Sequence, residues 1–588
     1  MTTLNQLLSI SFMLIIVSAT AAQSTFEFKS VKVPETDAEK RAILVAKEVR
    51  IADKSYPIDF HTLLRSGNSV GKGIFGLLVD AKGNPLKSAE GQPEISNKND
   101  FSSLIPIGKK LFMISHFEDL PGALYLTELK QDLTNGQLTA INTQFMDVSE
   151  IHGIWLPCAG SVTAWNTHLG SEEYEPDART LNLTTREVTH FGYMARYYGG
   201  NLLALNPYDY GFVIEVQLLN EQSDYSVKKH YAMGRRSLEL AYVMPDNKTV
   251  YLTDDGSNNG LYLFLADKPA DLSAGTLYAM KWQQTGAQQG GQANLEWIKL
   301  GQATDQQIQS YLAQKITFNA IFDTQIPTAN QACPESFQSI NTTVGQECLK
   351  VKPNMATAAA HLETRRYAAM MGATTELRKL EGMTLDSATN TLYVAITEIA
   401  LGMENHQKQG QSNDQYDQGG ANHIQLPFNR CGGIYALNLV TDNEIGSHYV
   451  AKNIKGLVMG KMIQANEKAS TKPTADHNQC DLESIANPDN ITAISGYNTL
   501  IIGEDTKEGH QNDMVWAYNL TTHHLTRIQT TPYGSETTSI YFYPNLNGFG
   551  YLMSVIPHPY GETDQDKLRQ PDEAKAYTGY IGPFPAIK

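Results

Sequence analysis

The chain has 588 residues, of which 41% are hydrophobic and 18% charged, so it is long enough to bury a large core and its composition is not that of a disordered protein. Its formal net charge is −16 at pH 7. A surface this acidic disfavours binding to nucleic acid and to anionic membranes, and it attracts cations such as calcium.

The first residues have the pattern of an export signal. An apolar run at 10–17 is followed by small residues at 19–21, although no lysine or arginine precedes the run. We predict a signal peptide over residues 1–22 and a periplasmic or extracellular location. The rest of the chain has no other long apolar run, so we predict no membrane span, and we expect a monomer.

Short strand patterns recur along the remaining chain. Residues 23–103 mix charges with short apolar runs and are predicted to form an extension that packs on the main domain. From Leu104 onward, strand patterns at 104–107, 110–115 and 122–127 begin a series of repeated units that is typical of a β-propeller. We therefore predict an all-β fold with a single propeller domain over residues 104–588. Helical and loop insertions are expected at about 283–375 and 403–430.

Four of these units share one layout, in which a polar residue precedes the middle of the next strand by a fixed offset. The pairs are Cys158 and Leu169, eleven residues apart, and Glu239 and Tyr251, Glu381 and Tyr393, and Asp489 and Ile501, each twelve apart. Two antiparallel strands joined by a tight turn give such an offset. Because the innermost strands of a propeller surround a central channel, we expect these four side chains to converge near its mouth.

A thiolate and three carboxylates at close range repel one another unless cations lie among them. Carboxylate oxygens suit Ca²⁺ and Fe³⁺, and the thiolate indicates at least one transition metal. Taken singly, each acid is more often a solvated residue than a ligand. Pairs of acids that follow the strands either complete calcium sites at the channel rim or are ordinary loop carboxylates: Glu172 and Glu173, Asp254 and Asp255, and Glu504 and Asp505.

The chain has five cysteines, an odd number. Cys333 could pair with Cys348 and Cys431 with Cys480, but the sequence alone leaves the connectivity open. Cys158 would then remain, either as a metal ligand or as a buried free thiol that behaves as a small hydrophobic residue.

The segment CAGSVTAWNTHLGSEE, residues 158–173, resembles the PhoX-type alkaline phosphatases, as do GRRSLE at 234–239, LYVAIT at 392–397 and NPDN at 487–490. The resemblance spans roughly residues 104–556, and the first motif is its specific part. It implies a secreted or periplasmic six-bladed propeller with iron and calcium at the channel mouth and activity on phosphate monoesters. By motif, Cys158 and Glu239 would bind iron, Glu381 and Asp489 would join them or bind calcium, and Glu173 would bind calcium.

Among several departures from the family pattern, two involve candidate site residues. Where the family often has Asn-His-Glu, this chain has Ser-His-Phe-Glu at 115–118, and Glu118 becomes a candidate metal ligand. Where the family tends to carry Arg-Pro before the acid of the third motif, this chain has Arg378, Lys379 and Leu380. Because a guanidinium can clamp phosphate oxygens with paired hydrogen bonds, we predict Arg378 as the first catalytic candidate. Lys379 and Glu239 are the other catalytic candidates, and Arg235 and Arg236 come behind them.

The sequence therefore predicts metal-dependent hydrolysis of small phosphate monoesters by a phosphate-scavenging alkaline phosphatase. Three other functions stay open. One is a calcium-dependent lactonase or phosphotriesterase-like hydrolase, and another is a secreted metal-binding propeller without phosphatase turnover. The third is a structural adhesion propeller, which would need no ring of ligands.

Overall fold

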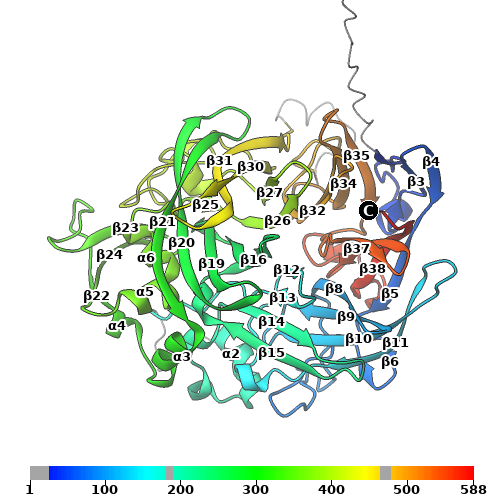
Figure 1. Cartoon of the computed structure of the whole chain (residues 1–588), viewed down its shortest axis with the longest axis horizontal. Coiled ribbons are helices and arrows are strands. Elements are labelled where there is room, and N and C mark those ends of the chain that lie inside the picture. The colour runs from blue at the N-terminus through cyan, green and yellow to red at the C-terminus, as the bar shows by residue number, and fades with distance from the viewer. Residues whose placement is uncertain (1–24, 180–189, 464–477, 588) are drawn as a thin grey trace, which may run out of the picture.

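A computed structural model describes residues 25–179, 190–463 and 478–587 (Figure 1). The predicted signal peptide over residues 1–22 lies outside this range. Antiparallel strands dominate the described part of the chain, in agreement with the predicted all-β class. None of the described helices is long and apolar enough to cross a membrane.

Six blades of antiparallel strands surround a central axis in the described residues (Figure 1). From the inside outward, blade one comprises β8 (Asn99–Ile107), β9 (Lys110–Phe117), β10 (Ala123–Gln131) and β11 (Leu138–Phe145), blade two β12 (Gly160–Val162), β13 (His168–Gly170), β14 (Val213–Leu218) and β15 (Tyr225–His230), and blade three β16 (Leu238–Val243), β17 (Thr249–Asp254), β19 (Tyr262–Lys268), β20 (Asp271–Gly286) and β21 (Gln292–Thr304). Blade four comprises β26 (Leu380–Asp386), β27 (Thr391–Ile396), β30 (Gly433–Asp442) and β31 (Ser447–Met459), blade five β32 (Pro488–Ile494), β33 (Thr499–Glu504), β34 (Met514–Asn519), β35 (Leu525–Thr530) and β2 (Leu44–Val45), and blade six β36 (Phe542–Leu546), β37 (Phe549–Ile556), β38 (Tyr577–Pro585) and β5 (Asp59–Arg65).

The inner strands close this ring. Neighbouring inner strands contact one another in turn from β8 to β36, and β37 of blade six contacts β8 of blade one. The architecture is therefore the predicted six-bladed β-propeller.

The second strand of a blade is buried on both faces, because neighbouring blades cover it. In β17, Val250 and Leu252 pack in one hydrophobic cluster while Tyr251, between them, packs in another. Successive side chains of a strand point to opposite faces, so the sequence of a strand that is covered on both sides is a continuous apolar run. This burial explains the runs that mark the blades in the sequence, such as Leu500, Ile501 and Ile502 in β33.

Both ends of the described chain meet in blade six, where β5 pairs with β38. The segment predicted as an extension over residues 23–103 therefore also supplies the outermost strand of this blade, and β8 of blade one already begins at Asn99. A separate sheet of β1 (Phe26–Phe28), β3 (Glu48–Ile51) and β4 (Lys54–Pro57) shares a hydrophobic cluster with blades five and six. The two chain ends thus hold the ring together.

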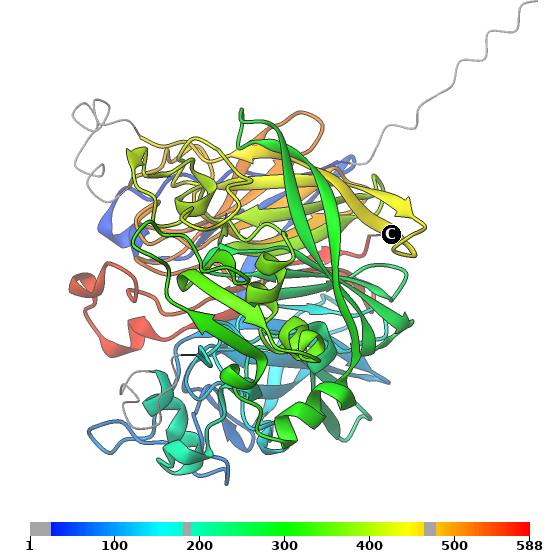
Figure 2. The ribbon, with the colours of Figure 1, turned by 90° about the vertical axis from the view of Figure 1, so that its left-hand side faces the viewer.

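Blades three and four form one continuous sheet, because β21 pairs with β31 at their outer edges. Residues 283–304, which we assigned to an insertion, lie mainly in the long hairpin of β20 and β21 (Figure 2). The helices and strands of the insertion itself follow it: α3 (Asp305–Ala313), α4 (Phe318–Ile321), β22 (Phe322–Gln325), β23 (Gln338–Thr342), β24 (Gly345–Val351), α5 (Ala356–Leu362) and α6 (Thr364–Met370).

Short elements complete the described structure: α1 (Asp37–Lys40), β6 (Ser69–Val70), β7 (Gly73–Ile74), α2 (His190–Ala195), β18 (Ser257–Asn259), β25 (Leu377–Arg378), β28 (Gln407–Lys408) and β29 (Gln411–Ser412). Pairing of β18 with β25 connects blade three to the start of blade four. The small hairpin of β28 and β29 belongs to the second predicted insertion, between β27 and β30.

Candidate metal centre

A cavity of about 380 Å³ lies at the end of the axis where the inner strands begin. All six blades contribute to its lining, which includes one thiol, ten carboxylates and two lysines. The thiol is that of Cys158, the carboxylates are those of Asp100, Glu118, Glu173, Glu239, Asp255, Glu381, Asp489, Asp505, Glu536 and Glu562, and the lysines are Lys98 and Lys379.

Irregular pairing at the start of four inner strands aims four of these acids at the cavity. The ladder between the first and second strands skips two residues between Asn99 and Ser102, Leu238 and Ala241, Leu380 and Met383, and Pro488 and Ile491. The first skipped residue is Asp100, Glu239, Glu381 or Asp489. Such β-bulges re-aim a side chain and are frequent beside active sites. The four acids therefore occupy equivalent positions in their blades.

The second strands supply another row of acids. In blade three Leu238 pairs with Asp254, so Asp255 is the residue that follows the ladder. Glu118 and Asp505 hold the same position in blades one and five. Each of these blades thus presents one acid from a bulge and a second acid from the adjacent strand end.

Blade four departs from this arrangement. Thr397 occupies the position of the second acid, and its hydroxyl donates a hydrogen bond to Glu381 Oε1 (2.6 Å). Glu398, the next residue, accepts a hydrogen bond from Arg378 Nε (2.7 Å). Blade four therefore contributes one acid to the cavity, and Glu398 holds the neighbouring arginine.

A lysine lies among the acids at this point. Lys379 Nζ is 3.2 Å from Glu381 Oε1, 3.5 Å from Asp255 Oδ2 and 3.8 Å from Asp505 Oδ2. Burial alone would lower the pKa of Lys379, but Asp255 and Glu381 raise it well above its usual value. Burial likewise disfavours the ionised form of Asp255, but Lys379 brings the pKa of that carboxyl below its usual value. The lysine is therefore charged and fixed by three blades.

Two groups of possible ligand atoms are close enough to hold metal ions. Cys158, Glu173 and Glu239 form one group, and Glu239, Glu381 and Asp489 form the other. Within each group the ligand atoms lie within 4.8 Å of one another. Glu239 belongs to both groups, so its carboxylate is a candidate ligand in each of them.

The chemistry of these groups fits cations. Burial, followed by the nearby acids, raises the pKa of Cys158 and of Glu239 well above their usual values. The same causes raise the pKa of Glu381 to about 7. Among the described residues, Glu239 Oε2 and Asp100 Oδ1 are buried without a hydrogen-bond partner. Buried polar atoms are normally satisfied, and metal ions would satisfy these while stabilising the ionised ligands.

Comparison with known proteins identifies the family. The family model described as "Alkaline phosphatase PhoX" matches residues 135–549, which is more than two thirds of the chain. The chain belongs to the PhoX alkaline phosphatase family. A comparison with curated proteins found no match.

One solved structure, that of a PhoX protein, has the same fold. The structure of Pseudomonas fluorescens PhoX in complex with vanadate, a transition state analogue, matches with a TM-score of 0.57 at 17% identity, covering 95% of this chain and 98% of that chain. A mutant Trypanosoma rangeli sialidase matches with a TM-score of 0.32 at 7% identity, covering 89% of this chain and 58% of that chain. A Trichoderma reesei protein of the carbohydrate-active enzyme family AA12 matches with a TM-score of 0.24 at 11% identity, covering 78% of this chain and 95% of that chain.

The six predicted metal ligands of this PhoX protein all line the cavity, and so does Lys379. Arg378 is not part of the lining, because its guanidinium is bound to Glu398 and to Ser257 Oγ (3.0 Å). Two arginines that we ranked behind it also lie elsewhere. Arg235 donates to backbone carbonyls, and Arg236 is fully buried 4.2 Å from the ring centre of Tyr262.

Sequence reasoning missed three acids of the PhoX cavity, namely Asp100, Glu536 and Glu562. Asp100 has the same twelve-residue offset as the others, since Phe112 lies in the middle of β9, and a search from the first blade would have found it. Glu536 precedes its inner strand by several residues, so no fixed offset marks it. Its carboxylate Oε2 lies 2.9 Å from His558 Nε2, which also lines the cavity.

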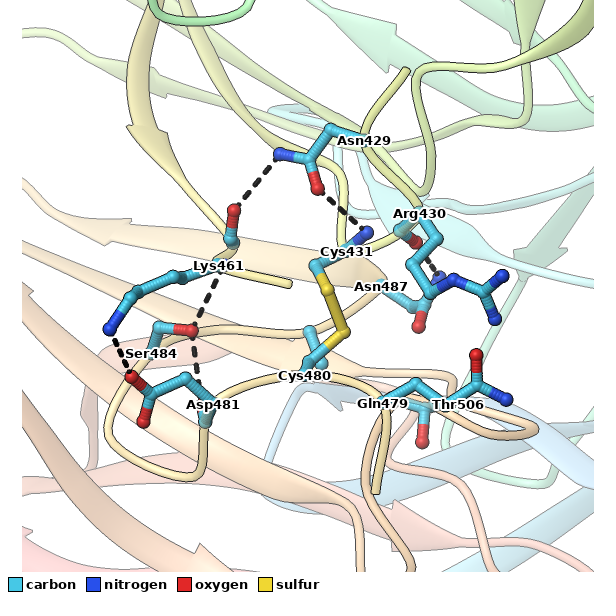
Figure 3. Close-up of a disulfide and its surroundings, with 12 residues drawn as sticks. Asn429, Arg430, Cys431, Lys461, Gln479, Cys480, Asp481, Ser484, Asn487 and Thr506 are labelled. Carbon is cyan, nitrogen blue, oxygen red and sulfur yellow. Dashed lines mark hydrogen bonds and ion pairs between the residues drawn. A yellow bond between two sulfur atoms is a disulfide. The ribbon is translucent and has the colours of Figure 1, made fainter. Parts of the chain in front are cut away.

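The disulfides that the cysteine pattern allowed are both present. Cys333 is bonded to Cys348, and Cys431 to Cys480 (Figure 3). Cys158 carries a free, partly buried thiol, 3.5 Å from Asp100 Oδ2. The free thiol is thus the one in the metal cavity.

Proposed function

We propose that this PhoX-family protein hydrolyses phosphate monoesters at a centre of iron and calcium ions in the cavity. One observation carries the proposal: a free thiol and buried carboxylates from four blades form two ligand groups that share Glu239. The family is that of alkaline phosphatases, and the relative in the solved complex binds vanadate, a transition state analogue.

The ligand types suggest how the ions would be divided. Cys158 and Glu239 would hold iron, because a thiolate favours a transition metal. Glu173 and Glu118 would bind calcium, and Glu381 and Asp489 would complete either kind of site. When bound, the ions supply Lewis-acid neutralisation of the phosphate charge and acidify a water molecule.

Lys379 would act directly on the substrate. Its ammonium stays protonated because Asp255 and Glu381 raise its pKa, and it lines the cavity among the candidate ligands. A fixed ammonium donor binds phosphate oxygens and stabilises negative charge in the transition state. Arg378 lies beside it in the sequence, and its contact with Glu398 would position the strand end that carries Lys379.

The alternative hydrolases are not favoured. A calcium-only lactonase or phosphotriesterase gains nothing from a thiol among its carboxylates, because calcium prefers oxygen ligands. A propeller whose ions only brace the blades would not need Lys379 inside the ring of acids. We further propose export to the periplasm or the exterior, which the two disulfides support, since disulfides persist in oxidising compartments.

Hydrolysis of p-nitrophenyl phosphate at alkaline pH tests the proposal. The purified mature protein should release p-nitrophenol, lose activity when calcium is chelated, and recover it when calcium is added back. Analysis of the same sample should find iron that withstands the calcium chelator. A protein that retains iron and calcium but hydrolyses no monoester would contradict the proposed function and favour a binding role.

A further inference from the structure

A second cavity, of about 160 Å³, adjoins the metal cavity. Tyr174 and Asp255 line both of them, so the two cavities are neighbours at these residues. The Tyr174 hydroxyl donates a hydrogen bond to Asp255 Oδ2 (2.5 Å), which holds the Tyr174 side chain at the boundary between the two cavities. An ester whose phosphate lies in the metal cavity must direct its leaving group either past Tyr174 and Asp255 into the second cavity or out to solvent.

The backbone of Tyr174 is held in an unusual conformation. Its N–H donates to Ser237 Oγ (2.7 Å), and its carbonyl accepts a hydrogen bond from Trp155 Nε1 (3.0 Å). Its φ is +44°, a left-handed value that is rare for an aromatic residue. Strain of this kind persists at functional sites when the surroundings enforce it. Tyr174 as a whole residue is 43% exposed, so part of it is accessible to a ligand.

The insertion after β21 builds the far wall of the second cavity. Its contributions are the turn between β23 and β24, residues 342–344, and the junction of α5 and α6, residues 362–366. Thr343 Oγ1 donates to the carbonyl of Ser257 (2.6 Å), which ties the turn to blade three. Arg365 donates to both carboxylate oxygens of Asp254 (2.9 and 2.5 Å), which ties the helices to the same blade. The wall is therefore fixed relative to the metal cavity.

The two arginines of this wall are both held in ion pairs. Arg365 pairs with Asp254 and Glu175, and Arg366 pairs with Glu347 and Glu363. The lining also carries hydroxyl groups, those of Ser237, Thr342, Thr343 and Thr364. Because both arginines of the wall are already held by acids, neither is free to bind an anionic group, whereas a hydroxyl oxygen that already donates, such as that of Thr343, can still accept a hydrogen bond. These features match a neutral leaving group that itself carries hydroxyls.

We propose that the second cavity is the leaving-group subsite for sugar and polyol phosphates, with Tyr174 as the aromatic residue against which the leaving group packs. The inference rests on the proposed phosphatase function and deepens it. Phosphate would lie with the metal ligands and Lys379, while the sugar would lie between Tyr174 and the insertion. The insertion would then determine which alcohols this phosphatase accepts.

Filling the subsite tests the proposal. Val344 lines the second cavity and is 47% exposed, so Val344→Trp narrows the subsite without disturbing the core. Ile326, which is 84% exposed and does not line the cavity, gives the matched control Ile326→Trp. For each protein we would measure the KM for glucose 6-phosphate and the Ki for inorganic phosphate, which has no leaving group.

Val344→Trp should raise the KM for glucose 6-phosphate about tenfold and leave the Ki for inorganic phosphate unchanged, whereas Ile326→Trp should change neither. Tyr174→Leu should raise the same KM, and Tyr174→Phe, which keeps the ring, should raise it much less. An unchanged KM in Val344→Trp, or equal changes in KM and Ki, would overturn the subsite. A wild-type protein that binds inorganic phosphate but hydrolyses neither glucose 6-phosphate nor p-nitrophenyl phosphate would instead refute the phosphatase function.

Discussion

Several acids of the metal cavity are unfavourable in their ionised form where they lie. Burial is the largest cause that raises the pKa of Glu239, of Asp489 and of the Cys158 thiol, and neighbouring acids add to it. Two lysines cannot neutralise ten carboxylates in the lining. The side chains would therefore hold protons unless metal ions replaced them. At the scale of single residues, the cavity is built to bind cations rather than to stabilise the fold.

Cys158→Ala should remove iron and abolish phosphatase activity while the protein stays folded. The thiol is the ligand most specific for a transition metal. Cys158 lines the cavity and is only partly buried, so it is not a core residue. Metal analysis, steady-state kinetics and circular dichroism on the same preparation would check this. Full iron content and full turnover in the variant would show that the thiol is not a ligand.

Lys379→Asn should lower kcat/KM for p-nitrophenyl phosphate about 100-fold, because a preorganised cationic donor is lost. Asparagine tolerates the left-handed φ of +47° at this position, so the fold should be kept. Metal content should also be kept, since lysine is not a ligand. Lys98→Asn is the matched control, because Lys98 lines the same cavity but is exposed, and its effect should be much smaller. Equal effects of both substitutions would show that only the summed charge matters.

At the scale of elements, the strands were predictable and the bulges were not. Continuous apolar runs mark strands that are buried on both faces, and the fixed offset from acid to strand reflects the shared bulge at Glu239, Glu381 and Asp489. The same offset holds for Asp100, which sequence reasoning missed. The position of Arg378 could not be predicted, because its partner Glu398 comes from the neighbouring strand end and the pairing depends on tertiary contacts.

The Cys431–Cys480 disulfide lies near Asn487, which precedes one of these bulges in the chain (Figure 3). The carbonyl of Cys431 accepts a hydrogen bond from the N–H of Asn487 (3.0 Å), and Asn487 Nδ2 donates to the carbonyl of Arg430 (2.8 Å). Asp489 follows two residues later at the start of β32. The disulfide thus braces the turn that leads into a candidate metal ligand.

Replacing both Cys431 and Cys480 by serine should lower metal content and activity as well as stability. The disulfide spans 49 residues, so its loss should lower the free energy of unfolding by up to about 4 kcal/mol. The matched control replaces Cys333 and Cys348, which are 15 residues apart and do not line the metal cavity. Loss of that disulfide should lower the free energy of unfolding by up to about 3 kcal/mol without loss of metal. Equal metal content in the two variants would show that the Asn487 turn does not depend on its disulfide.

At the scale of the whole molecule, the propeller brings together residues that are hundreds of positions apart in the sequence. Blade six combines β5 from the N-terminal part with β36 to β38, so the ring closes only when both chain ends are in place. The number of blades followed from the family resemblance, whereas this closure did not follow from any local pattern. Pairing between distant strands depends on the completed ring.

The closed ring also makes the stability of the metal-free protein decrease as the pH rises above neutral. In the folded state the pKa of Asp100 is raised to about 8 and that of Glu381 to about 7, chiefly by burial. Buried histidines do not counter this above neutral pH, because burial lowers the pKa of His116 to about 4. At pH values between the ordinary carboxyl pKa range and these raised pKa values, the folded state therefore binds more protons than the unfolded state.

Stability of the chelated protein should therefore fall as the pH rises from about 6.5 to about 8.5, because the change of unfolding free energy with pH follows the protons bound by the unfolded state minus those bound by the folded state. That difference is negative here, and each unit of raised pKa corresponds to about 1.4 kcal/mol. Bound calcium and iron should remove the trend, since they stabilise the ionised carboxylates that protons otherwise neutralise. Thermal unfolding at a series of pH values, with and without chelator, measures both cases. A chelated protein that gains stability over this range would show that the raised carboxyl pKa values are absent, and with them the electrostatic reason for a metal centre in the channel.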